Sequence, residues 1–95
     1  MIKDIKITQN TIKIVEETKG LFKVKIEEIS IDLSTIDKIE KFMKDNELIG
    51  FAMWSKNEVI HAIGIKNYED NIEKLLNQIL ENMDKNSVEI FESIV

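Results

Sequence analysis

The side chains of this sequence that could perform chemistry are few and lie far apart. His61 is the single histidine, and its neighbours at two-residue spacing, Val59 and Ile63, are apolar. A metal site at His61 would need carboxylates around it. This setting favours a structural histidine, and a pH-sensitive imidazole is the functional alternative. We therefore expect no metal site and no cofactor.

The serines, glycines and acidic residues form no recognisable catalytic set. No serine lies in a nucleophile elbow, and one histidine leaves a serine triad only one possible base. The three glycines, Gly20, Gly50 and Gly64, are too far apart for a phosphate-binding loop. The oxygen-rich segment 67–73 lacks the alternating ligands and central glycine of a calcium loop, so helix capping explains it better. The sequence predicts a protein that is not an enzyme.

Composition argues against nucleic acid and membranes as partners. Of 95 residues, 18 are acidic and 13 are basic, which gives a formal net charge of -5. Every basic residue is a lysine, so the arginine side chains that commonly read phosphates and base edges are missing. The chain is 43% hydrophobic, yet it has no apolar run that could span a bilayer and no cysteine. We expect a single cytoplasmic domain over residues 1–95.

The elements that must position these side chains begin with a predicted three-stranded meander. Alternating apolar residues indicate strands on either side of short turns at residues 9–10 and 19–20. Gly20 is expected to take a positive φ in the second turn. The apolar phase then shifts by one residue at 27–28, which predicts a β-bulge or a bend in the third strand.

Helical spacing follows the meander. Apolar residues three and four positions apart predict a helix of about twelve residues after Ser34, with Asp37 completing a capping box. A second helix is expected from Asn67, as its N-cap, through about residue 84. A last strand is expected over 88–95.

Two apolar segments between these helices, 48–54 and 59–65, predict a central hairpin around the turn 56–57. With those two residues in the turn, Ala52 would lie opposite His61. Both faces of this hairpin are apolar, so we expect both to be covered.

The second apolar face of the hairpin is the candidate interface. Its expected members are Leu48, Trp54, Val59, Ile63 and Ile65. Gly50 and Ala52 would leave a flat floor between them. Either one helix packs on each face of the sheet, or both helices pack on one side and this face meets a second subunit or a partner protein. In the second case Trp54 is the expected anchor.

The elements together predict an α+β sandwich in the order βββ-α-ββ-α-β, with a mainly antiparallel sheet of about six strands and two helices. From residue 35 to residue 95 the chain resembles the first two-thirds of a roadblock/dynein light chain domain, in the longin/profilin-like superfamily. The matching segments are 36–43, 49–54, 58–64, 70–83 and 88–91. The resemblance implies a non-enzymatic module that dimerises through a helix and a sheet edge. It also implies docking on small GTPases or on motor and scaffold assemblies.

The function expected from the sequence is a small protein–protein interaction or regulatory module, acting as a homodimer or as an adaptor. One alternative is a small-molecule-binding domain with a pocket near Trp54, His61 and Tyr68. A second alternative, motivated by the acidic balance and small size, is a viral or mobile-element protein that inhibits a host complex by charge mimicry.

Overall fold

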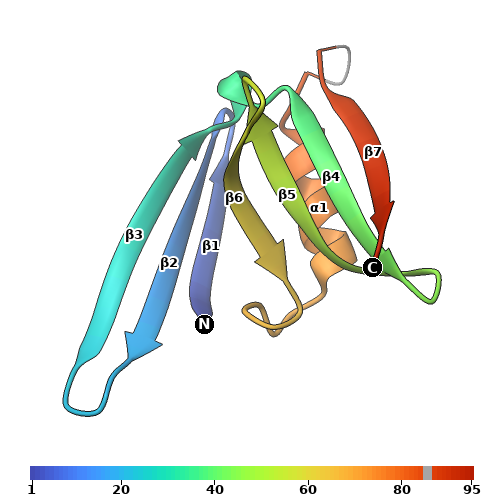
Figure 1. Cartoon of the computed structure of the whole chain (residues 1–95). Coiled ribbons are helices and arrows are strands. Elements are labelled where there is room, and N and C mark those ends of the chain that lie inside the picture. Colours follow the sequence, from blue (N-terminus) through green and yellow to red (C-terminus); the bar gives the residue numbers. More distant parts are fainter. Residues whose placement is uncertain (85–86) are drawn as a thin grey trace.

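The computed structural model describes residues 1–84 and 87–95, and these residues form seven strands in two sheets, one α-helix and a short 3₁₀ turn (Figure 1). Sheet A is an antiparallel meander of β1 (Ile2–Thr8), β2 (Thr11–Lys19) and β3 (Val24–Asp32). This part of the sequence prediction is confirmed. Alternation of isoleucine with polar residues suits a sheet that has one face in the core.

Sheet B has the strand order β6-β5-β4-β7. Its strands are β4 (Lys38–Lys44), β5 (Glu47–Ser55), β6 (Glu58–Gly64) and β7 (Glu89–Ile94). The first three form antiparallel hairpins, whereas β7 lies parallel to β4. The helix α1 (Ile72–Glu81) lies in the connection from β6 to β7, which run parallel at opposite edges of sheet B, and parallel strands need a long crossover.

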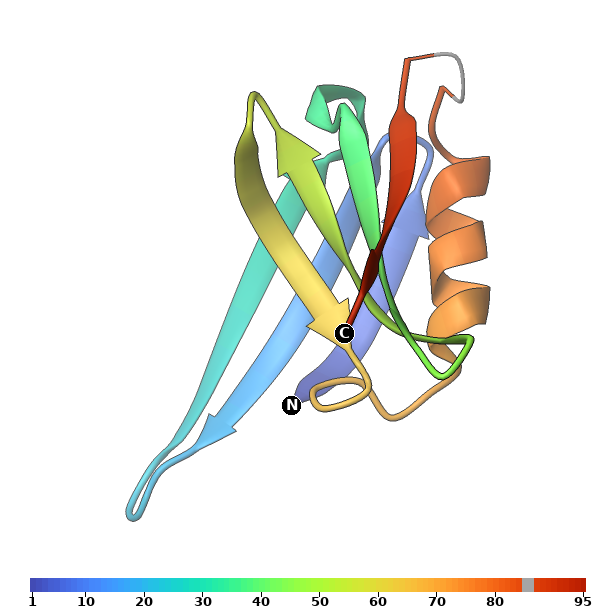
Figure 2. The ribbon, with the colours of Figure 1, turned by 45° about the vertical axis from the view of Figure 1, so that its right-hand side comes forward.

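Sheet A and α1 lie on the same side of sheet B, with the hydrophobic core between the three (Figure 2). We call the side of sheet B that contacts this core its inner face and the opposite side its outer face. The core residues with almost no exposed surface are Ile12, Ile14, Ile39, Phe51, Met53, Ile63 and Ile79.

The predicted two-helix α+β sandwich is wrong, because the segment expected to form the first helix is a strand. Asp32 caps only a 3₁₀ turn, Leu33–Thr35, and the chain then enters β4. As a central strand, β4 pairs with β5 on one edge and with β7 on the other, and these ladders outweigh the weak helical spacing. The element order implied by the roadblock resemblance is therefore not present in the described residues.

Both hairpins of sheet B use two-residue turns in the left-handed region. Lys56 and Asn57 have φ values of 51° and 66°, which confirms the predicted turn. Asp45 and Asn46 have φ values of 52° and 65°. Asn and Asp tolerate this conformation and the resulting turn matches the twist of antiparallel strands, so Asp45 and Asn46 help to make β4 a strand.

The pairing of β5 with β6 differs from the expected one beyond the first pairs. Trp54 lies opposite Val59, as predicted, but the next pair is Met53 with His61 because the register shifts between Met53 and Trp54. The predicted pairing of Ala52 with His61 is wrong. One additional residue in β6 reverses the faces of all residues that follow it, and this irregularity moves His61 to the inner face.

The predicted bulge in β3 is also wrong. The pairing of β3 with β2 is continuous from Val24 to Asp32. The turn between these strands is the longer segment 20–23, and Gly20 does not have a positive φ. The apolar residues before and after the phase shift therefore lie on opposite faces of sheet A.

The helix α1 begins later than predicted and is shorter. Its N-cap is Asn71, whose side chain accepts a hydrogen bond of 3.0 Å from the Lys74 N–H. Asn67, the predicted cap, instead accepts a hydrogen bond of 2.8 Å from the Gly64 N–H and so closes the turn after β6. The helix ends at Glu81, before the expected end near residue 84. The predicted last strand is present as β7.

Candidate functional site

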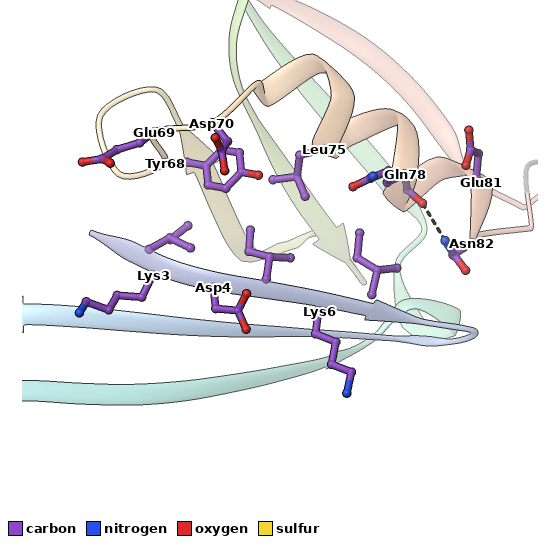
Figure 3. A pocket seen from close by; sticks show the side chains of 13 residues that line it. Lys3, Asp4, Lys6, Tyr68, Glu69, Asp70, Leu75, Gln78, Glu81 and Asn82 are labelled. Carbon is purple, nitrogen blue, oxygen red and sulfur yellow. Dashed lines mark hydrogen bonds between the residues drawn. The ribbon is translucent and has the colours of Figure 1, made fainter.

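A groove of about 580 Å³ lies between β1 and α1 (Figure 3). Tyr68 and Leu75 lie between these two elements, whereas Lys3, Asp4 and Lys6 point away from α1 on the other side of β1. The lysines are therefore not directed at a ligand in the groove. The groove is the seam along which the apolar side of β1 faces the helix.

Tyr68 is the aromatic side chain of this groove, and it packs partly buried against the core. Burial raises the pKa of the Tyr68 phenol, and the nearby Asp70 carboxylate raises it further. The phenol therefore stays protonated at neutral pH and does not act there as a base.

A second hollow, of about 540 Å³, lies on the outer face of sheet B. Its floor is made of small residues, since Gly50 of β5 lies opposite Gly64 of β6 and the exposed Ala62 lies beside them. The half-buried Phe42 of β4 forms a wall. The other side chains that reach this hollow include Lys44, Ile65, Lys66 and Val95. We call this site the outer hollow.

The two glycines let β5 and β6 approach closely beneath the outer hollow. A Cβ atom at Gly50 would lie 2.9 Å from the Ile63 carbonyl oxygen and 3.1 Å from the Gly64 Cα. Both distances are too short for a relaxed contact with backbone atoms. The flat floor therefore depends on glycine at position 50.

Glu40 anchors the polar part of the outer face. The Trp54 Nε1–H donates a hydrogen bond of 3.2 Å to Glu40 Oε1, and the Ser93 hydroxyl donates one of 2.5 Å to Glu40 Oε2. These residues come from β5, β4 and β7, so the carboxylate links three strands across this face. The hydrogen bond holds the half-buried Trp54 ring near β4.

The five residues of the predicted interface are divided between the two faces of sheet B. Trp54 belongs to the outer face, and Val59 and Ile65 are 50% and 59% exposed. Ile63 is 1% exposed and lies in the core, and Leu48 is partly buried against the same core. The register shift in β6 explains the position of Ile63, because that shift reverses the face that follows it.

Trp54, His61 and Tyr68 do not line one pocket in the described structure. Trp54 lies on the outer face and Tyr68 in the groove beside β1. The His61 imidazole lies between the sheets, with its buried Nε2 3.3 Å from Glu16 Oε1 of β2. This contact connects β6 to β2 and gives His61 a structural place between the two sheets.

A projecting arm is the surface that the sequence interpretation missed. The β2–β3 hairpin extends away from the rest of the molecule in both views (Figures 1 and 2). We call its outer part, residues 17–26, the arm. Leu21 and Phe22 are 95% and 96% exposed, and Val24 and Ile26 are 59% and 64% exposed. The phase shift at residues 27–28 was the available signal, since without a bulge it places apolar side chains on the unpacked face.

No group of three or more His, Cys, Asp or Glu side chains in residues 1–84 and 87–95 is arranged to hold a metal ion. Over the same residues, no helix has both the length and the apolar character that crossing a bilayer requires. No family model, curated protein or solved structure matches this chain.

Proposed function

We propose that this chain is a non-enzymatic adaptor that binds a partner protein in the outer hollow. The observation that supports this proposal is the exposed, small-residue floor beside Phe42, which no described element of the chain covers. Apolar hollows of this kind are common anchor sites for side chains of protein partners. A cytoplasmic location, expected from the absence of cysteine, is part of the proposal.

The charges around the outer hollow define the chemistry of the partner. The whole chain is acidic, with a net charge of -5, but the two charged side chains that line the hollow are Lys44 and Lys66. A complementary segment would place an apolar side chain on the Gly50 and Gly64 floor and an acidic side chain near these lysines. The partner segment is therefore an acidic peptide with an apolar anchor.

A library of random peptides displayed on phage tests this function with the full chain as bait. We expect enriched peptides to share an apolar residue next to an aspartate or glutamate. Binding of a selected peptide should change the emission of Trp54, the single tryptophan, which lies on the same face. Lys66→Glu should weaken binding at least about tenfold, because it places like charges together.

Two further variants make the result specific to the outer hollow. Ala62→Phe fills the hollow from an exposed position and should abolish peptide binding while the melting temperature stays unchanged. Lys13→Glu reverses an exposed charge on sheet A and should leave binding intact. Selected peptides that bind Ala62→Phe as well as the original chain, or a library without enrichment, would refute the proposed function.

A further inference from the structure

The outer edge of β3 is a free strand edge. In the described residues β3 pairs only with β2, and it forms the end of sheet A. Its backbone N–H and C=O groups on the outer side are therefore open to pairing with another strand. Sheet edges are usually protected by charge, brevity or irregularity. Because β3 has nine residues and a continuous register, its protection comes from its charged side chains, which are Lys25, Glu27, Glu28 and Asp32.

The arm adds apolar surface beside this edge. Val24 and Ile26 of β3 lie on one face of the strand, and Lys25 and Glu27 lie on the other. The Lys25 ammonium and the Glu27 carboxylate are 2.5 Å apart and largely exposed. Near the arm, the edge thus carries Val24 and Ile26 on one face and one charge of each sign on the other, with Glu28 next along the apolar face.

The order of these residues makes the edge complementary to itself. Two identical antiparallel strands pair about a two-fold axis, and only every second residue directs its backbone groups to the free edge. The axis must therefore pass beside one residue of each strand, so that this residue lies opposite its own copy. If that residue is Ile26, each Lys25 lies opposite the Glu27 of the other copy.

The neighbouring registers each place a like-charge pair at the axis. An axis at Lys25 places two lysines opposite each other, and an axis at Glu27 or Glu28 places two glutamates opposite each other. Directly opposed like charges destabilise a strand pair. Among these positions, the axis at Ile26 gives two opposite-charge pairs and no like-charge pair.

We propose that a second copy of this chain pairs with the edge of β3, antiparallel and centred on Ile26. The two sheets A then form one continuous six-stranded sheet, since each contributes three strands. Ile26 lies opposite Ile26 of the other copy, and each Val24 lies diagonal to that pair and opposite Glu28 of the other copy. This contact removes part of the exposed arm from water. This surface is separate from the outer hollow, so the dimer does not depend on the proposed peptide site.

Charge reversal tests the pairing through two variants that should complement each other. Lys25→Glu and Glu27→Lys should each weaken self-association at least about tenfold, because each places like charges across the pair. A mixture of the two variants should form a heterodimer, since every Lys then faces a Glu again. Light scattering over a dilution series measures each mass. Glu92→Lys, at an exposed charge on sheet B, is the matched control and should leave the dimer intact.

Cysteine cross-linking tests the register independently, because the chain contains no cysteine of its own. Ile26→Cys should form an intermolecular disulfide on oxidation, since directly opposite residues have Cα atoms about 4.5–5.5 Å apart. Val24→Cys should not, because its two copies would be about 14 Å apart along the strands. Both positions are exposed, so folding of these variants is not at risk.

A wild-type chain that is monomeric at every concentration would overturn the proposal. So would variants Lys25→Glu and Glu27→Lys that associate as strongly alone as when mixed. Cross-linking through Val24→Cys but not Ile26→Cys would exclude the proposed register. Loss of the dimer with peptide binding intact would leave the proposed function unaffected.

Discussion

Glu17 of β2 is a charged side chain that is nearly buried, with 9% of its surface exposed. Its Oε2 lies 2.6 Å from the Lys3 ammonium on the neighbouring strand β1, and its Oε1 lies 3.9 Å from Lys19. The hydrogen bond from Lys3 lowers the pKa of Glu17, against the opposing effect of burial, and the positive charges of Lys3 and Lys19 lower it further. The Glu17 carboxylate thereby links β1 to β2.

This pKa predicts how acid affects the fold. Because the pKa of Glu17 is lower in the folded state than in the unfolded state, ionised Glu17 stabilises the protein above its unfolded pKa. That contribution is lost as the pH falls through the folded pKa. Between about pH 5 and about pH 3, the unfolding free energy should therefore fall more for the original chain than for Glu17→Gln. Urea denaturation at both pH values measures the difference, and identical losses would contradict this role for Glu17.

Gly50 gives a second prediction at the level of one residue. Gly50→Ala should lower the unfolding free energy by about 1–3 kcal/mol, because the new Cβ would press on backbone atoms of β6. Gly64→Ala is the control, since its Cβ would meet the Ile49 carbonyl oxygen at the longer distance of 3.3 Å. Thermal melts of both variants should rank Gly50→Ala as the less stable. The reverse order would show that β5 and β6 can separate beneath the outer hollow without cost.

At the scale of elements, the apolar stripe of α1 is what attaches the helix to the sheets. Ile79 has no exposed surface, and Leu75 and Leu76 have 2% each. Ile79→Asp would bury a carboxylate without a partner, so we expect loss of cooperative unfolding, a cost above about 3 kcal/mol. Asn77→Asp adds the same charge at an exposed position of α1 and should melt like the original chain. A folded Ile79→Asp variant would mean that the helix can leave the core.

Secondary structure was predicted best from the sequence where an element has one face in the core and the other exposed to solvent. Alternation of apolar and polar residues identified the strands of sheet A, and the strong stripe of α1 identified the helix. It failed for β4, where Ile39 faces the core and Phe42 faces the outer hollow, because apolar residues on both faces imitate helical spacing. The Asp45-Asn46 turn was the local signal for a hairpin there.

The candidate surfaces were less predictable because they depend on register. One extra residue in β6 decides that Ile63 lies in the core, although Val59, which precedes the shift, is exposed on the outer face. No residue type in that strand indicates the shift. Trp54 was predicted on the correct strand and beside the correct partner. The arm was not predicted, since a bulge was invoked to keep its apolar residues on the core side.

At the scale of the whole molecule, the arm contributes much less to stability than the rest of the described structure does. Leu21 and Phe22 are almost fully exposed, so Leu21→Ser and Phe22→Ser should leave the melting temperature unchanged. The same substitutions should lower nonspecific adhesion, because they remove apolar surface from the tip of the arm. Melting curves and retention on a hydrophobic column measure the two effects. A large loss of stability would show that the tip of the arm packs against the rest of the molecule.

The parallel pairing of β7 with β4 has a consequence for the order in which the protein is made. The other strand pairs join strands that are adjacent in sequence, whereas the pair β4 and β7 joins Lys38 to Glu89, which is synthesised much later. As the ribosome extends the chain, β4 can pair with β5 long before its second edge is closed. We expect the β7 amides to exchange hydrogen before those of β5 in the native protein, and equal protection would argue against this order. Until synthesis reaches β7, the nascent chain therefore exposes an unpaired edge of β4, a strand that lies in the interior of sheet B once folding is complete.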